Sequence, residues 1–301
     1  MSGKFQTKKA LQIWGITAAI VSVVSAVLRL LSILFFYDAN IGYYKSGAIL
    51  PIIAQVLPAI AVITALVFSV VPNLRPTPEV NDNCKKIKAV AIFPAAGFSG
   101  YTVVYFIKLA EYLRGLDVII IKNIMWDMII ALALVGASAF FWLIFLDKKV
   151  GSTLYAATGL CVIVSAVYFL AGSYFDSLVQ MNAPNKVVFQ FAVLAMMLLT
   201  VNELRIGQEE KRPMFHLFSA TAASIYMATS AVPSIICSFI GKMPLNYSLL
   251  FEDGILLFFA VFAIVRVFSL CFVQDSVVKK DITEGSEHSQ EAEDPIQQDI
   301  E

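Results

Sequence analysis

The chain has 301 residues, of which 59% are hydrophobic and 15% are charged, and its mean hydropathy is +0.78. Soluble globular domains have about 45–50% apolar and about 25% charged residues, so this composition indicates a protein that folds in a lipid bilayer. Four cysteines in so long a chain exclude a secreted disulfide scaffold, and the hydrophobic content excludes disorder of the whole chain. The 22 basic residues equal the 22 acidic ones, which by itself suggests no electrostatic preference for any partner.

Eight stretches of the chain have the character of a membrane-spanning helix, which needs about 20 mostly apolar residues. Together they contain seven charged residues, and five of these lie close to a span end, where interfacial water reaches them. The pattern predicts an all-α, polytopic integral membrane helix bundle of about eight transmembrane helices, with the lipid bilayer as its main partner. The predicted spans are residues 10–36, 48–71, 89–107, 123–146, 150–173, 184–204, 214–240 and 251–273.

The first span follows three lysines, as the apolar part of a secretory signal does, but its 27 residues exceed the about 7–15 of a signal. We therefore expect it to remain as the first membrane helix. Arg29 lies in its outer half, about 9 Å from the centre by helical rise. A long arginine side chain at this depth either snorkels or faces the bundle, or it lines an internal cavity.

The third span, 89–107, is the weakest of the eight because it contains Pro94, Gly97 and Gly100. A plain crossing and a broken or re-entrant helix are both compatible with this sequence. The segment 108–122 that follows alternates apolar and charged residues, which favours a short interfacial helix.

Asp127 lies beside Trp126 at the outer mouth of the fourth span, where tryptophan usually anchors a helix at the headgroup level. A proton or cation relay needs acids deeper in the spans, and their absence disfavours a proton-coupled pump. Asp127 stays a candidate site residue because it could line a cavity that opens to the outside.

Arg266, on the cytoplasmic side of the centre of the eighth span, is the second deep cation. Glu203 and Arg205 close the sixth span and are expected at the cytoplasmic interface. No acid lies as deep as the two arginines, so neither is expected to have a buried carboxylate partner. Besides the structural interpretation, one or both arginines could bind a small anionic solute or a lipid headgroup, since the guanidinium fork suits carboxylate and phosphate. The candidate internal polar site is Arg266, Arg29 and Asp127.

Residues 274–301 contain nine acids, two lysines and no aromatic residue, whereas residues 1–273 carry 20 basic and 13 acidic residues. The zero net charge therefore conceals a basic bundle and an acidic segment. Such a segment cannot bury a core, and we expect a disordered acidic cytoplasmic tail. The tail is either a solubilising segment or a docking segment for a cytoplasmic protein partner.

The positions of lysine and arginine determine the expected orientation, because cytoplasmic segments carry an excess of both. With the N-terminus inside, the inner segments hold fourteen of these residues and the outer segments six. This predicts a multi-pass protein of the cell membrane with both termini cytoplasmic.

No catalytic, cofactor-binding or metal-binding motif is present. The chain has no nucleotide-binding glycine loop, no His-Glu-x-x-His and no Gly-x-Ser-x-Gly. Its two histidines and four isolated cysteines lack the spacing of zinc ligands. We expect no cofactor and no nucleic-acid partner, and an enzyme is disfavoured without being excluded.

Prolines inside the predicted spans favour a transporter-like or permease-like protein, or the membrane subunit of a transport complex. Each proline frees a backbone carbonyl, and transporters use such carbonyls to bind ions. The alternative is a non-transporting membrane sensor or assembly partner that acts through its acidic tail. The prolines in question are Pro51, Pro58, Pro94 and Pro233.

Overall fold

The computed structural model describes residues 2–38, 42–70, 85–114, 121–148, 151–175, 183–207, 213–243 and 247–272, so the predicted tail lies outside the described residues. Within these ranges the protein is almost entirely helical. A short antiparallel hairpin, in which Tyr37 pairs with Tyr44, follows the first helix. The elements in chain order are α1 (Ser2–Phe36), β1 (Tyr37–Asp38), β2 (Tyr43–Tyr44), α2 (Ile49–Val70), α3 (Lys85–Val90), α4 (Ile92–Arg114), α5 (Ile121–Phe145), α6 (Ser152–Phe175), α7 (Pro184–Gly207), α8 (Pro213–Phe239) and α9 (Tyr247–Phe272).

Eight helices in the described ranges are long and apolar enough to cross a membrane, with α3 and α4 together forming one stretch, Lys85–Arg114. This confirms the predicted all-helical fold and its number of span-length helices. Large apolar side chains face outward along these helices, among them Ile49 at 70% and Leu132 at 65% exposure. A protein in water would bury faces of this kind, whereas a bilayer would cover them.

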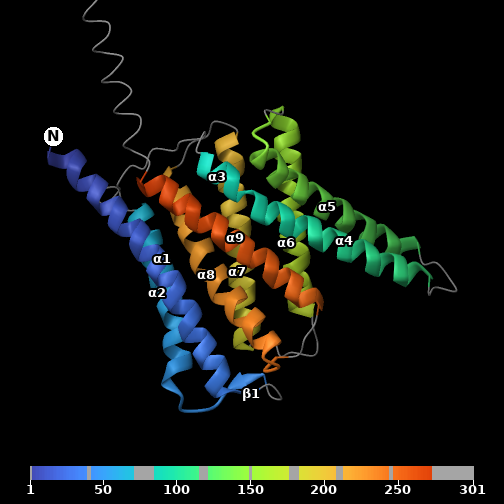
Figure 1. Cartoon of the computed structure of the whole chain (residues 1–301), viewed down its shortest axis with the longest axis horizontal. Coiled ribbons are helices and arrows are strands. Elements are labelled where there is room, and N and C mark those ends of the chain that lie inside the picture. Colours follow the sequence, from blue (N-terminus) through green and yellow to red (C-terminus); the bar gives the residue numbers. More distant parts are fainter. Residues whose placement is uncertain are drawn as a thin grey trace, which may run out of the picture.

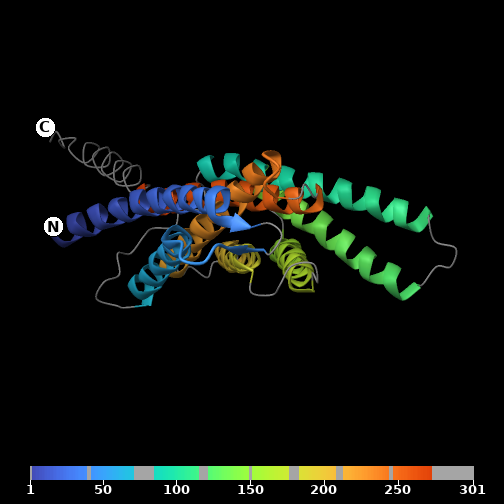
Figure 2. The ribbon, with the colours of Figure 1, turned by 90° about the horizontal axis from the view of Figure 1, so that it is seen from below.

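Helix α8 lies at the centre of the bundle and packs against α1, α2, α7 and α9, while α4 and α5 form a pair that extends to one side (Figures 1 and 2). The start of α1 and the end of α9 lie at the same end of the bundle (Figure 1). We refer to it as the terminal end. The opposite end, which carries β1 and β2, is the hairpin end.

The predicted irregularity of the third span is a one-residue interruption at Ala91, between α3 and α4. Its cause is Pro94, which has no N–H to donate to Val90 and whose ring crowds that carbonyl. Helical hydrogen bonds still cross the junction, from the Ala91 nitrogen to the Ile87 oxygen (3.0 Å) and from the Ala95 nitrogen to the Ala91 oxygen (3.1 Å), so the chain does not turn back.

Helix α4 continues without a break through Lys108 to Arg114. The separate interfacial helix predicted over residues 108–122 is therefore wrong at its start, because this segment extends the preceding helix. The extension carries part of one wall of the cavity described below.

Phenylalanine rings hold α4 and α5 against α9. Phe141 of α5 packs edge-on against Phe259 of α9 with ring centroids 4.9 Å apart, and it stacks on Phe98 of α4 at 6.1 Å. All three rings are at most 1% exposed. Helices α5 and α6 approach each other at Gly136, where an added Cβ atom would clash with the Cys161 sulfur. Small residues commonly allow such contacts between membrane helices.

Candidate functional site

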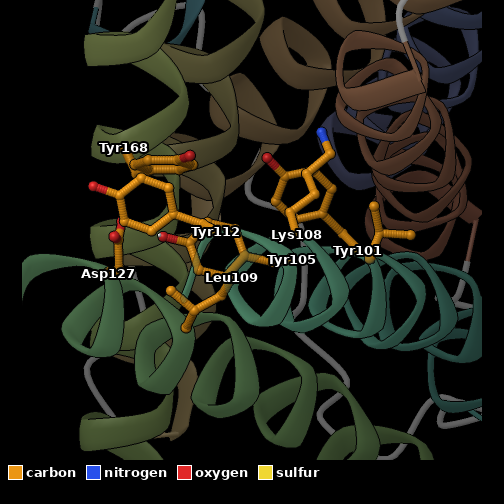
Figure 3. A pocket seen from close by; sticks show the side chains of 8 residues that line it. Tyr101, Tyr105, Lys108, Leu109, Tyr112, Asp127 and Tyr168 are labelled. Carbon is orange, nitrogen blue, oxygen red and sulfur yellow. Dashed lines mark hydrogen bonds between the residues drawn. The ribbon is translucent and has the colours of Figure 1, made fainter. Parts of the chain in front are cut away.

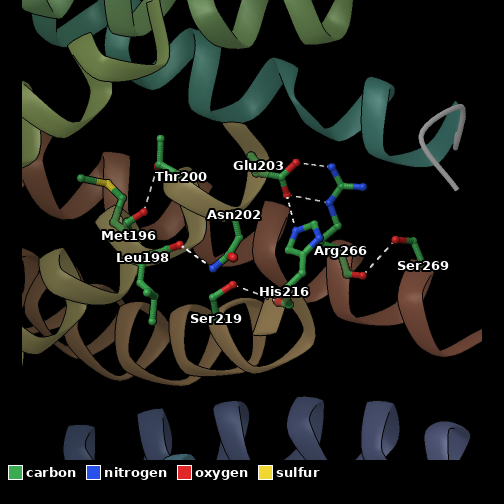
Figure 4. Close-up of polar contacts among 9 residues, drawn as sticks. All are labelled: Met196, Leu198, Thr200, Asn202, Glu203, His216, Ser219, Arg266 and Ser269. Carbon is green, nitrogen blue, oxygen red and sulfur yellow. Dashed lines mark hydrogen bonds and ion pairs between the residues drawn. The ribbon is translucent and has the colours of Figure 1, made fainter. Parts of the chain in front are cut away.

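Arg266 of α9 belongs to a buried charged cluster with Glu203 of α7 and His216 of α8 (Figure 4). The Arg266 Nε donates to Glu203 Oε1 at 2.6 Å, and Nη2 donates to Oε2, so the pair is bidentate. The His216 Nε2 lies 2.9 Å from the same Oε1. The side chains of Arg266, Glu203 and His216 are 7%, 3% and 2% exposed, respectively. One carboxylate thus joins three helices near the terminal end.

The expectation that Arg266 lacks a buried carboxylate partner is wrong, and so is the placement of Glu203 at a hydrated interface. Glu203 lies four residues before the end of α7, and Arg266 lies six before the end of α9. The corresponding depths differ by only about 3 Å, which two long side chains easily cover. The Arg266 fork is therefore already occupied by a protein carboxylate, and an external anion would have to displace it.

Arg29 of α1 is 2% exposed and makes its hydrogen bonds to neutral groups. Its Nη1 donates to the Thr229 carbonyl of α8 at 3.0 Å, and its Nη2 donates to Asn185 Oδ1 of α7 at 3.0 Å. The Thr229 carbonyl has no helical donor because the residue four positions later is Pro233, which lacks an N–H. Arg29 supplies the donor that this proline removes.

The hairpin is fastened to the same arginine. Tyr44 interacts electrostatically with Arg29, and the Tyr37 and Tyr44 rings meet edge-to-face with centroids 5.6 Å apart. Burial raises the pKa of Tyr44, which keeps its hydroxyl protonated beside the cation. Asp253 of α9 is near enough to interact electrostatically with Arg29, but no ion pair within 4.0 Å joins them in the described ranges. Arg29 therefore connects α1, α7, α8 and the hairpin.

Asp127 lies in a cavity of about 270 Å³ between α4, α5 and α6, which we name the tyrosine pocket. Figure 3 shows its side chains converging from these three helices, with one wall supplied by a single face of α4. Hydroxyl groups, aromatic rings and one carboxylate share the space. The lining residues are Tyr101, Val104, Tyr105, Lys108, Leu109, Tyr112, Asp127 and Tyr168.

Two carboxylates accept hydrogen bonds from the tyrosines of this pocket. The Tyr105 hydroxyl donates to Asp127 Oδ1 at 3.1 Å, which links α4 to α5. The Tyr101 hydroxyl donates to Glu252 Oε1 at 3.1 Å, which links α4 to α9. Lys108 is exposed and interacts electrostatically with Glu252. Among the described residues, the pocket and its immediate surroundings thus hold the acids Asp127 and Glu252 and the base Lys108.

The three residues of the predicted polar site lie in three different places, and Asp127 is the one that lines the pocket. Sequence reasoning missed the tyrosines, although Tyr101, Tyr105 and Tyr112 recur with Lys108 at spacings of three and four residues, which places them on one helix face. Among the described residues, no group of three or more His, Cys, Asp or Glu side chains could hold a metal ion.

Comparisons of the chain with known protein families, with curated proteins and with solved structures gave no match.

Proposed function

We propose that the chain is a transporter-like, multi-pass protein of the cell membrane that binds a small solute in the tyrosine pocket. The observation that carries this proposal is the pocket itself, a cavity of about 270 Å³ with four tyrosines and Asp127 in its wall. Small-molecule sites are concave, have mostly apolar and aromatic walls, and contain a few converging polar groups. The volume is suited to a small solute.

The distribution of basic residues supports an orientation with both termini in the cytoplasm, since fourteen lysines and arginines then lie in inner segments and six in outer ones. In this orientation α4 runs outward. The pocket residues of α4 run from Tyr101, near its middle, to Tyr112, near its end, and Asp127 lies near the start of α5. The solute would therefore reach the pocket from the outer side.

Solute binding would change the packing of the helices through the two hydroxyl–carboxylate hydrogen bonds made by the pocket tyrosines. A solute that competes for the Tyr105 hydroxyl loosens α4 from α5, and one that competes for the Tyr101 hydroxyl loosens α4 from α9. A ligand shifts a conformational equilibrium only by its difference in affinity for the two states. The two hydrogen bonds provide this difference in affinity, because the solute would contact the same tyrosine hydroxyls that make them.

The pocket is a better candidate for solute binding than either deep arginine. The Arg266 fork holds Glu203, and two guanidinium nitrogens of Arg29 donate to Thr229 and Asn185. An anionic solute or lipid headgroup at either arginine would have to replace these partners. The alternative function, a non-transporting sensor or assembly partner, depends on the tail at 274–301, which lies outside the described residues.

Uptake by reconstituted protein tests the proposal. Proteoliposomes are incubated with a mixture of small solutes, and their contents are compared by mass spectrometry with those of empty liposomes. We expect at least one solute to accumulate, and Val104→Trp to abolish its accumulation by filling the pocket. Val103→Trp is the matched control, because Val103 is the neighbouring residue, lies outside the pocket and is 59% exposed.

Two outcomes would contradict the proposal. One is the absence of any accumulated solute, and the other is equal accumulation by folded Val104→Trp and Val103→Trp protein. Deletion of residues 274–301 distinguishes transport from the alternative function. If the chain acts as a sensor or assembly partner through its tail, the deletion should abolish a phenotype or the binding of a protein partner and leave uptake unchanged. A cytoplasmic reporter fused after residue 45 is expected to be inactive, and an active one would reverse the proposed orientation.

A further inference from the structure

We infer that the tyrosine pocket takes a small organic cation, with an ammonium or methylated ammonium group held between tyrosine rings and Asp127. The inference rests on the proposed solute-binding function and adds the chemical class of the solute. Three properties of the pocket support it: its charge, the arrangement of its rings and its size.

The charge of the pocket favours a cation. Asp127 is half-buried in the wall, and its Oδ1 accepts the Tyr105 hydroxyl, while Oδ2 has no donor among the described residues. Glu252 lies behind Tyr101, and the exposed Lys108 interacts with it electrostatically. A ligand with one positive charge would complete the coordination of Asp127 and leave the site close to neutral.

The tyrosine rings are arranged like part of an aromatic cage. Tyr105 and Tyr168 are nearly perpendicular, at 89° with centroids 6.0 Å apart, and Tyr101 is tilted by 38° from Tyr105 at 6.5 Å. A cation within about 6 Å of a ring centroid is attracted by the negative face of the ring, and cages of this kind recognise quaternary ammonium groups. Since Tyr101 and Tyr105 donate their hydroxyl protons to carboxylates, their rings are richer in electrons and attract a cation more strongly.

The volume of about 270 Å³ limits the ligand to a small molecule, and choline is small enough to fit. A neutral sugar would use the rings and hydroxyls but would gain little from the charge of Asp127. An anion would face the Asp127 carboxylate in the pocket wall. A zwitterion would need Lys108 for its negative group, and this lysine already interacts with Glu252.

Binding measurements on the purified full-length protein in nanodiscs test the inference. The probes are choline, its uncharged isostere 3,3-dimethylbutan-1-ol, the anion 3,3-dimethylbutanoate and the zwitterion glycine betaine, each titrated by calorimetry. We expect choline to bind at least about tenfold more tightly than each of the other three.

Variants assign the effect to the pocket. Asp127→Asn keeps an oxygen that accepts the Tyr105 proton, so the fold should be preserved, and we expect choline to bind at least about tenfold more weakly. Lys108→Gln removes the competing charge and should tighten choline binding about twofold to fivefold. Glu111→Gln is the control, since Glu111 is an exposed acid on α4 outside the pocket wall and should leave binding unchanged.

The results separate the inference from the proposed function. Equal binding of the uncharged isostere, the anion or the zwitterion, or choline binding that Asp127→Asn leaves unchanged, would overturn the cation class. The proposed function stands in that case if Val104→Trp still abolishes uptake of some other solute. If no probe binds, the cation class is likewise overturned. Choline binding without uptake of any solute would retain the cation site and overturn transport.

Discussion

The two charged regions of the molecule differ in how fully their carboxylates are paired with donors. At the terminal end, both oxygens of Glu203 have partners on Arg266, and one of them also contacts His216, with all three side chains buried. In the tyrosine pocket, Asp127 has one hydroxyl donor among the described residues and lines a cavity. A fully partnered buried charge joins helices, whereas a partly partnered charge at a cavity can accept a ligand. The comparison predicts that stability and binding depend on different residues.

The largest loss of stability is expected from Arg266→Leu. This change leaves Glu203 buried without its cation, and breaking a buried ion pair by removing one partner costs about 3–5 kcal/mol. The free energy of unfolding can be measured by SDS titration of the detergent-solubilised protein. Arg205→Leu is a suitable control, because it removes the same type of side chain from a half-buried position on α7 near Glu203.

The double variant Glu203→Leu/Arg266→Leu sharpens this result. Replacing a buried ion pair by apolar residues is often close to neutral, so the double variant should be more stable than Arg266→Leu alone. Additive losses in the double variant, or an Arg266→Leu protein as stable as Arg205→Leu, would contradict the role assigned to the cluster.

A smaller loss of about 2 kcal/mol is expected from Arg29→Leu, which removes hydrogen bonds from a charged donor to neutral groups. If Arg29 replaces the donor missing at Pro233, then Pro233→Ala should reduce the cost of Arg29→Leu by about 1 kcal/mol, since alanine restores the N–H for Thr229. The coupling is measured with a double-mutant cycle in the same unfolding assay.

Pro58→Ala provides the control for this cycle, because Pro58 is also inside a helix but lies in α2. It should leave the cost of Arg29→Leu unchanged. Equal coupling to both prolines, or no coupling to Pro233, would show that Arg29 stabilises the protein in another way.

The sequence predicted the helices well because hydropathy over about 20 residues is a local property. It also identified the third span as the one that could be irregular, since Pro94, Gly97 and Gly100 are visible in it, but it left open whether the helix is broken. It did not predict the Glu203–Arg266 pair, because nothing local indicates that α7 and α9 meet at this depth. Counting residues from the ends of the spans, rather than from their centres, would have placed both side chains at a similar level.

The candidate site was predicted in part. Asp127 was identified as an acid beside a possible cavity, but the tyrosines around it were not. The spacing of Tyr101, Tyr105, Lys108 and Tyr112 places them on one face of α4, and this signal was available in the sequence. That this face meets α5 and α6, rather than lipid, depends on the Phe98–Phe141 and Gly136–Cys161 contacts between helices. Helical periodicity cannot supply such long-range information.

The smallest effect on stability is expected from Asp127→Asn, below about 1 kcal/mol, in the same assay that shows the largest loss for Arg266→Leu. Asparagine preserves an acceptor for the Tyr105 hydroxyl, and the side chain is only half-buried, so little desolvation energy changes. Tyr105→Phe, which removes the donor instead, should also cost no more than about 1 kcal/mol. A loss of several kcal/mol in either variant would mean that Asp127 joins helices as Glu203 does. This result would contradict the proposal that the pocket is a ligand site. A small loss combined with weakened choline binding would instead locate stability at the terminal end and recognition in the pocket.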